Sequence, residues 1–99
     1  MTRVAAFEIH HSAFLGPQGE ILRPIPPPLD DPATLQELYR GMVLTRTFDA
    51  KAIALQRTGR LGTYASSLGQ EACAVGIGHA MHESDVLLPS FREHGTQLY

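Results

Sequence analysis

One stretch, residues 85–95, constrains the fold more than any other part of the chain. It reads D-V-L-L-P-S-F-R-E-H-G and holds the only short apolar run bounded by turn signals, Val86 to Pro89. A run of this length is typical of a buried strand, although periodicity alone does not distinguish it from a piece of helix. Ser90 and Glu93 follow with the spacing of a capping box, which opens a helix. The stretch therefore predicts a strand, a tight turn and a helix start.

Arg92 falls at the mouth of this expected helix, close to His94. Ligands of open α/β sheets bind beyond the carboxyl ends of strands, and the free N–H groups of a helix N-terminus favour anions. The guanidinium fork of Arg92 suits a phosphate group, and the His94 imidazole adds a second polar side chain beside it. The alternative is a surface helix start with solvated charges, and this stretch alone favours that alternative.

Composition argues against several classes of function. The 99 residues carry a net charge of −2 and no basic block, so neither nucleic acid nor an anionic membrane is an expected partner. No apolar run approaches the roughly 20 residues of a membrane span. The single cysteine, Cys73, fits a reducing cytoplasm, and its small apolar neighbours predict a buried, unreactive thiol. His10 and His11 are adjacent and lack a nearby acidic cluster, so no metal site is expected there.

The chain divides near residue 30. Residues 1–29 form an arm, in which a G-P-Q-G turn could close a small hairpin before a Pro-rich spacer. The arm carries enough apolar side chains to predict that it wraps another surface. The chain ends about two turns after Ser90 without a capping glycine. We therefore expect the N-terminal part of a longer protein, the alternative being a small protein whose last helix frays.

Asp31 and Pro32 open the first clear helix, because Asp is a good N-cap and Pro a favoured first helical residue. A capping box at Thr34 is a competing start. Apolar residues recur at spacings of three and four, and predict a long amphipathic helix to about Thr58. Gly59 is then the expected left-handed stop.

A second helix is expected over residues 69–81, after a loop at 60–68. Ser67 and Gln70 have capping-box spacing and predict its start. Small residues share one face of this helix and predict that another backbone approaches closely there. These small residues are Gly69, Cys73, Gly76 and Ala80.

Four motifs in this order resemble those of the thiamine-diphosphate-dependent 2-oxo acid dehydrogenases. They read L-Y-R-G-M-V-L-T-R-T-F-D, G-R-L-G-T-Y, S-L-G-Q-E-A and D-V-L-L-P-S-F-R-E-H-G. The resemblance covers about residues 35–99 and is to the N-terminal part of the alpha subunit of the decarboxylating component, shared by pyruvate, branched-chain 2-oxo acid and acetoin dehydrogenases. It implies an α/β fold, the N-terminal portion of a thiamine-diphosphate-binding fold, mostly helical within these residues with about one core strand. Residues 1–29 are then a Pro-rich N-terminal arm, and residues 30–99 the incomplete start of that domain.

The resemblance also implies site residues. Phe91 and Arg92 stand where the family has an aromatic–Arg pair that contacts the cofactor, so Arg92 is expected to meet the diphosphate. Phe91 replaces the usual Tyr, which removes a hydroxyl contact but keeps a ring to pack. Some pyruvate-type members have a His where Ala65 stands, so that contact is absent. The candidate substrate-lining residues are Tyr64, Ser66, Ser67 and His94.

In the family, the thiazolium carbon of thiamine diphosphate attacks the 2-oxo group, carbon dioxide leaves, and the acyl unit passes to a lipoyl group on a partner acyltransferase. A beta subunit completes the site in a heterotetramer. The magnesium motif, G-D-G followed by Asn, is not among these residues, so its ligands are expected beyond residue 99. No catalytic residue or metal ligand is expected in this fragment, which should be inactive alone. The alternative is a non-catalytic helical interaction module with a Pro-rich arm.

Overall fold

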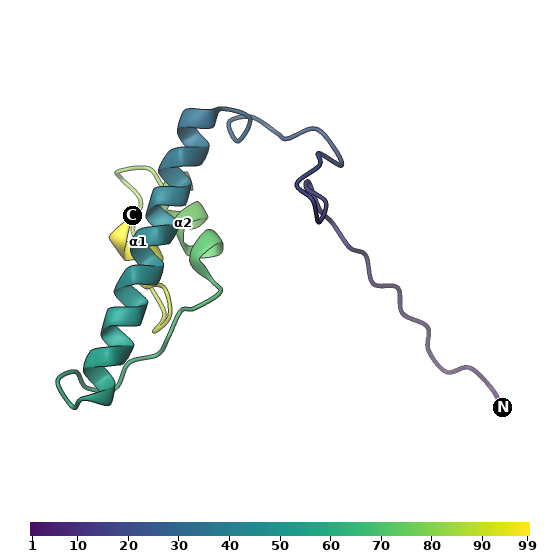
Figure 1. Cartoon of the computed structure of the whole chain (residues 1–99). Coiled ribbons are helices and arrows are strands. Elements are labelled where there is room, and N and C mark those ends of the chain that lie inside the picture. Colours follow the sequence, from purple (N-terminus) through teal and green to yellow (C-terminus); the bar gives the residue numbers. More distant parts are fainter.

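The structure is a computed structural model that describes all 99 residues and contains three α-helices. They are α1 (Pro32–Arg57), α2 (Glu71–Ala80) and α3 (His94–Leu98). All three pairs of helices are in contact. Figure 1 shows α1 as a long rod with α2 packed beside it and the N-terminal arm leading away. None of the three helices combines the length and the apolarity that crossing a bilayer requires.

Helix α1 begins and ends where its capping residues predict. The carboxylate of Asp31 accepts hydrogen bonds from two backbone N–H groups and from the hydroxyl of Thr34, the last at 2.8 Å. Asp31, rather than the competing Thr34, is therefore the N-cap, and Pro32 is the first helical residue. At the other end Thr58 is the C-cap, and Gly59 has a φ of 72°. The prediction of this helix and of its left-handed stop is confirmed.

The core where the helices meet is small and largely polar. On α1 the buried face is formed by Thr45, Asp49 and Ala52. The apolar stripe predicted for α1 lies beside this face rather than on it, and Leu35 and Val43 remain exposed. Part of that stripe lines an apolar groove of about 480 Å³ between α1 and α2. The residues buried in the structure are Thr45, Asp49, Ala52, Ser67, Glu71, Ala74, Val75, Gly95 and Thr96.

Helix α2 starts later than predicted, at Glu71. No side chain caps it, and the hydroxyl and N–H of Ser67 bind a carboxylate of α1 instead, so the predicted capping box is wrong. The bond to a buried carboxylate is charge-assisted and stronger than the bond that the cap would make.

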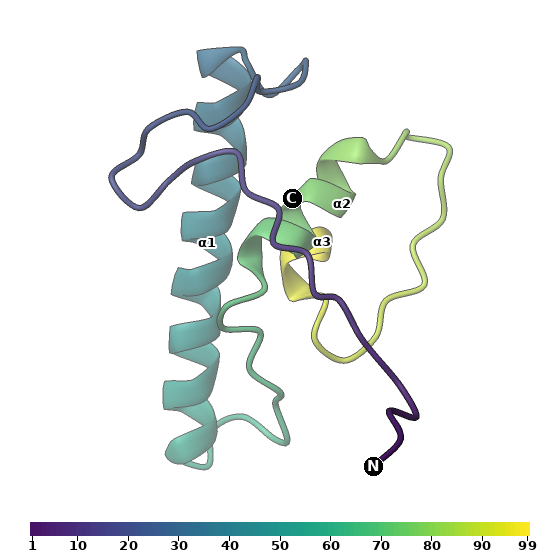
Figure 2. The ribbon, with the colours of Figure 1, turned by 90° about the vertical axis from the view of Figure 1, so that its right-hand side faces the viewer.

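The predicted contact face of α2 is also wrong. Cys73 is exposed, whereas Ala74 and Val75 face the other helices. Figure 2 shows α2 close to both α1 and α3. Ala74 and Val75 are buried at these contacts, since Ala74 lies against Gly95 of α3 and Val75 against Gly41 of α1. A close approach does occur on α2, but at Gly78, where a Cβ would lie 3.1 Å from the side chain of Tyr99.

Residues 81–93 form a connection without a strand. Val86 is 82% exposed and Leu88 is 89% exposed, and no neighbouring strand pairs with this run. Because a strand exists only through hydrogen bonds to a partner, the one expected here is not formed within these residues. The side chain of Glu93 does accept the N–H of Ser90 at 2.6 Å, which is half of the predicted capping box, but helix α3 begins only at His94. The thiamine-diphosphate-binding fold stays a prediction.

The N-terminal arm contains a small ordered turn at residues 16–19, besides the turn at residues 27–30 that leads into α1. Leu15 and Ile21 form an antiparallel bridge across the G-P-Q-G turn, so the predicted hairpin is confirmed. The Arg23 side chain lies over the Phe14 ring of the hairpin, with its guanidinium carbon 4.4 Å from the ring centre. Residues 1–12 are exposed and run away from the helices (Figure 1). That the arm wraps another surface stays a prediction.

Candidate functional site

A single carboxylate holds the loop between α1 and α2. Asp49 is 4% exposed on the buried face of α1. It accepts the Tyr64 hydroxyl at 2.8 Å, the Ser66 hydroxyl at 2.7 Å and the Ser67 backbone N–H at 2.7 Å. The Ser67 hydroxyl adds a longer bond of 3.3 Å to the same oxygen that Tyr64 contacts. Three predicted substrate-lining residues are therefore brought together by a residue that the sequence analysis missed.

The electrostatics of this cluster make Asp49 a charged acceptor. Burial acts to raise the pKa of Asp49, but hydrogen bonds from Ser66, Ser67 and Tyr64 together outweigh it and leave the pKa below its usual range. Burial and the bond to the Asp49 carboxylate raise the pKa of Tyr64 to about 12. Near neutral pH the Asp49 carboxylate is therefore ionised. The Tyr64 phenol stays protonated and donates a hydrogen bond to Asp49.

His94, the first residue of α3, contacts the same loop at Tyr64 and Ala65. Its ring stacks on Tyr64, with the centroids 4.8 Å apart and the planes inclined by 20°. Its Nε2 lies 3.2 Å from the carbonyl oxygen of Ala65. Because a carbonyl oxygen only accepts, Nε2 carries the proton in this contact. Phe48 of α1 completes the aromatic cluster, with centroids 6.3 Å from Tyr64 and 6.0 Å from His94.

Phe91 and Arg92, the predicted cofactor pair, lie at the surface next to this loop. The Arg92 guanidinium donates a hydrogen bond to the carbonyl oxygen of Ser66. It also lies over the Phe91 ring, with its central carbon 5.2 Å from the ring centroid. Phe91 is 71% exposed, so its ring is available to a ligand and is not part of the core. Every predicted site residue thus lies in residues 64–67 or 91–94, and the two segments are in contact.

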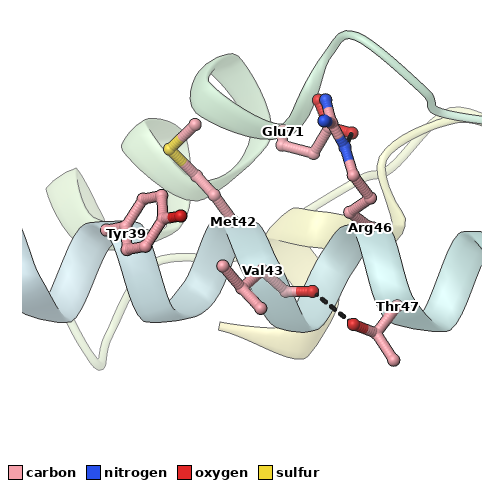
Figure 3. A pocket seen from close by; sticks show the side chains of 6 residues that line it. All are labelled: Tyr39, Met42, Val43, Arg46, Thr47 and Glu71. Carbon is pink, nitrogen blue, oxygen red and sulfur yellow. Dashed lines mark hydrogen bonds and ion pairs between the residues drawn. The ribbon is translucent and has the colours of Figure 1, made fainter.

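A second buried carboxylate, Glu71 of the G-Q-E-A motif, forms a separate site. It accepts Arg46 Nε at 2.8 Å and the Gly69 N–H at 3.0 Å. The bond from Arg46 is the main reason that the pKa of Glu71 falls to about 2. Figure 3 shows the two side chains meeting above α1, at the edge of a hollow of about 220 Å³. No predicted site residue lines this hollow. The lining residues are Tyr39, Met42, Val43, Arg46, Thr47 and Glu71.

Comparison with known proteins decides the family. The family model of the dehydrogenase E1 component matches residues 39–99, more than half of the chain. The chain belongs to this family. The pyruvate dehydrogenase E1 component subunit alpha of Bacillus subtilis is 38% identical over 91 residues, which cover 86% of this chain and 24% of that protein. The predicted resemblance to alpha subunits of 2-oxo acid dehydrogenases is confirmed.

Other E1 relatives carry two different names. The pyruvate dehydrogenase E1 component subunit alpha of Acholeplasma laidlawii is 46% identical over 66 residues, 67% of this chain and 19% of that protein. The 3-methyl-2-oxobutanoate dehydrogenase subunit alpha of Mycobacterium tuberculosis is 43% identical over 65 residues, 66% of this chain and 18% of that protein. The chain thus spans a quarter or less of the length of these relatives. No solved structure matches it.

The side chains at residues 91–92 fit the anionic end of a thiamine diphosphate cofactor, which membership of the E1 family implies. A guanidinium has five N–H donors, and the Ser66 carbonyl engages one group of Arg92, so further donors can bind phosphate oxygens. The exposed ring of Phe91 offers an apolar surface beside them. No group of three or more His, Cys, Asp or Glu side chains is arranged to hold a metal ion. The side chains of Phe91 and Arg92 therefore fit a diphosphate group and the ring beside it.

Proposed function

We propose that this chain is part of the alpha subunit of a thiamine-diphosphate-dependent 2-oxo acid dehydrogenase, which decarboxylates a 2-oxo acid and passes the acyl group to a lipoyl-bearing acyltransferase. The observation that carries the proposal is the exposed guanidinium of Arg92, fixed to the Ser66 carbonyl in a chain of the E1 family. When bound, the cofactor supplies the electron sink for decarboxylation. The substrate class is a 2-oxo acid, since the relatives include both pyruvate and 3-methyl-2-oxobutanoate dehydrogenases.

The chain's own residues bind and orient in this proposal. Arg92 holds the diphosphate through its free N–H groups, and the Phe91 ring packs beside the cofactor. The loop of Tyr64 and Ser66, with His94 stacked against it, faces the substrate, while Ser67 is buried and holds the loop to Asp49. Magnesium ligands, catalytic groups and a beta subunit come from outside residues 1–99, in an assembly of two alpha and two beta subunits. The 99-residue chain by itself is therefore inactive.

The substitution Arg92→Ala tests the proposal in the full-length subunit assembled with its beta partner. Loss of a charge-assisted contact costs about 1.5–3 kcal/mol, so thiamine diphosphate affinity should fall roughly 10- to 150-fold. Calorimetric titration measures this affinity. Arg40→Ala, which removes an exposed arginine of α1, is the matched control and should leave the affinity unchanged. Equal affinities for wild type and Arg92→Ala would overturn the role of Arg92, and an assembled wild type that binds no thiamine diphosphate would overturn the function.

A further inference from the structure

The side-chain hydrogen bonds of Asp49 all go to one short loop. Both of its carboxylate oxygens are engaged, Oδ2 by the Ser66 hydroxyl and Oδ1 by Tyr64 and Ser67. The salt bridges of the chain do not include Asp49, although Arg46 and Arg57 line the same hollow beside it. A buried charge is costly unless hydrogen bonds replace the lost water. The residues of this loop supply those bonds, and the loop is held to α1 in return.

The same loop residues hold the segment that carries the predicted cofactor contact. Ser66, whose hydroxyl binds Asp49, gives its carbonyl oxygen to the Arg92 guanidinium. Tyr64, whose hydroxyl binds Asp49, stacks on the His94 ring. The intervening residue, Ala65, offers its carbonyl oxygen to His94 Nε2. Two short series of contacts therefore begin at Asp49. One runs through Ser66 to Arg92, and the other runs through Tyr64 to His94.

We propose that Asp49 is a positioning residue, which fixes the Arg92 guanidinium through Ser66 and the His94 imidazole through Tyr64. By fixing Arg92 it sets cofactor affinity without touching the cofactor. This proposal rests on the proposed function, because it takes Arg92 as a cofactor contact. The competing explanation is that Asp49 only stabilises the fold. In that case its loss would lower the melting temperature and leave the affinity of the folded molecules unchanged.

Glu71 provides a matched control for Asp49. Like Asp49, Glu71 is a helical residue with a buried carboxylate, and it is likewise 4% exposed. The side-chain hydrogen bonds of Glu71 go to Arg46 and Gly69, and none reaches residues 64–67 or 91–94. Glu71→Gln therefore removes a comparable buried charge and leaves the contacts that link Asp49 to Arg92 and to His94 in place.

The first experiment needs no cofactor. Asp49→Asn keeps the shape of the side chain but replaces one acceptor oxygen with an amide donor, which cannot accept from the loop. Hydrogen–deuterium exchange of the assembled full-length protein should become faster in peptides covering residues 61–70 and also in those covering 88–99, while residues 32–45 stay protected. Glu71→Gln should leave the exchange of residues 88–99 as in wild type. Faster exchange confined to 61–70 would overturn the coupling to Arg92 and His94.

The second experiment measures affinity. Thiamine diphosphate titration of Asp49→Asn should show binding weakened about tenfold, and Asp49→Asn with Arg92→Ala should bind no more weakly than Arg92→Ala alone, because both act through one contact. Asp49→Glu, which keeps the charge, should recover most of the affinity. Additive losses, or a lowered melting temperature with wild-type affinity, would overturn the proposal.

The Tyr64→Phe variant and the cofactor binding of the wild type give two further tests. If Asp49→Asn does not assemble, Tyr64→Phe removes a single bond to Asp49 and keeps the stacked ring. It should still speed exchange in residues 88–99, and exchange equal to wild type would count against the proposal. If the assembled wild type binds no thiamine diphosphate, the proposed function fails by itself, while the exchange measurements still decide whether Asp49 couples the two segments.

Discussion

Gly95 closes the F-R-E-H-G motif at the point where α3 meets both other helices. It is buried, and a Cβ placed on it would lie 2.8 Å from the Ala74 Cβ and 3.0 Å from the Thr45 Cγ2 and Oγ1 atoms. Neither neighbour can turn away. The Ala74 methyl has no rotamers, and the Thr45 hydroxyl is bonded to the Gly41 carbonyl at 2.8 Å. The substitution Gly95→Ala therefore forces α3 away from α1 and α2.

The expected size of this effect follows from two opposing contributions. Forcing an extra methyl group into a packed site costs about 1–3 kcal/mol. Replacing Gly by Ala in a helix recovers up to about 1 kcal/mol. Because the contact with Ala74 is closer than real Cβ atoms come, the cost lies in the upper part of its range. We expect Gly95→Ala to lower the free energy of unfolding by about 1–2 kcal/mol.

The same substitution at Gly76 is the control. Gly76 lies inside α2, and a Cβ there would meet nothing within 4 Å, so Ala should stabilise the chain by about 0.5–1 kcal/mol. Urea unfolding of the 99-residue chain, followed by circular dichroism, compares both variants with wild type. The two changes should have opposite signs. A Gly95→Ala chain as stable as wild type would refute the packing of α3 against Ala74 and Thr45.

Two further predictions concern pH and helix capping. The pKa of Glu71 is lowered from 4.5 to about 2, so its ion pair with Arg46 contributes stability that is present above pH 4.5 and lost as the pH falls toward 2. Urea midpoints measured from pH 6 to pH 2 should fall less steeply for Glu71→Gln than for wild type, and parallel curves would contradict the pair. Asp31→Ala removes the N-cap of α1 and should destabilise the start of that helix. Amide exchange should then speed up in the first turn of α1, and unchanged protection there would mean that Asp31 is not the cap.

Local signals predicted the parts of the fold that depend on neighbours in sequence. Asp31, Pro32 and Gly59 act on the chain within a few residues of themselves, and α1 begins and ends as they indicate. The G-P-Q-G turn likewise brings Leu15 and Ile21 together without help from the rest of the chain. These features are decided by capping geometry and by turn conformation, which a sequence displays directly.

Predictions failed where a distant partner decides the outcome. Ser67 has the spacing of a cap for α2, but the carboxylate of Asp49 on α1 offers a stronger acceptor. The small residues of α2 suggest a contact face, yet the side that packs is the one that α1 and α3 cover. The run Val86 to Leu88 has the composition of a strand, but no strand within these residues pairs with it. Sequence shows the preference of each segment and not which partner is within reach.

The candidate site shows why the order of the motifs is more informative than any one of them. Asp49 ends the motif R-T-F-D, Tyr64 ends G-R-L-G-T-Y, and His94 lies in F-R-E-H-G, and the three are joined by a hydrogen bond and a stacked pair of rings. The remaining motif, S-L-G-Q-E-A, is tied to the first helix as well, through Glu71 and Arg46. The residues at the ends of these contacts were predictable from the sequence, but Asp49 was not, because an acid on an amphipathic helix is usually solvated. Its position four residues after Thr45 and three before Ala52 places it on the face that becomes buried, and only the packing of the helices shows which face that is.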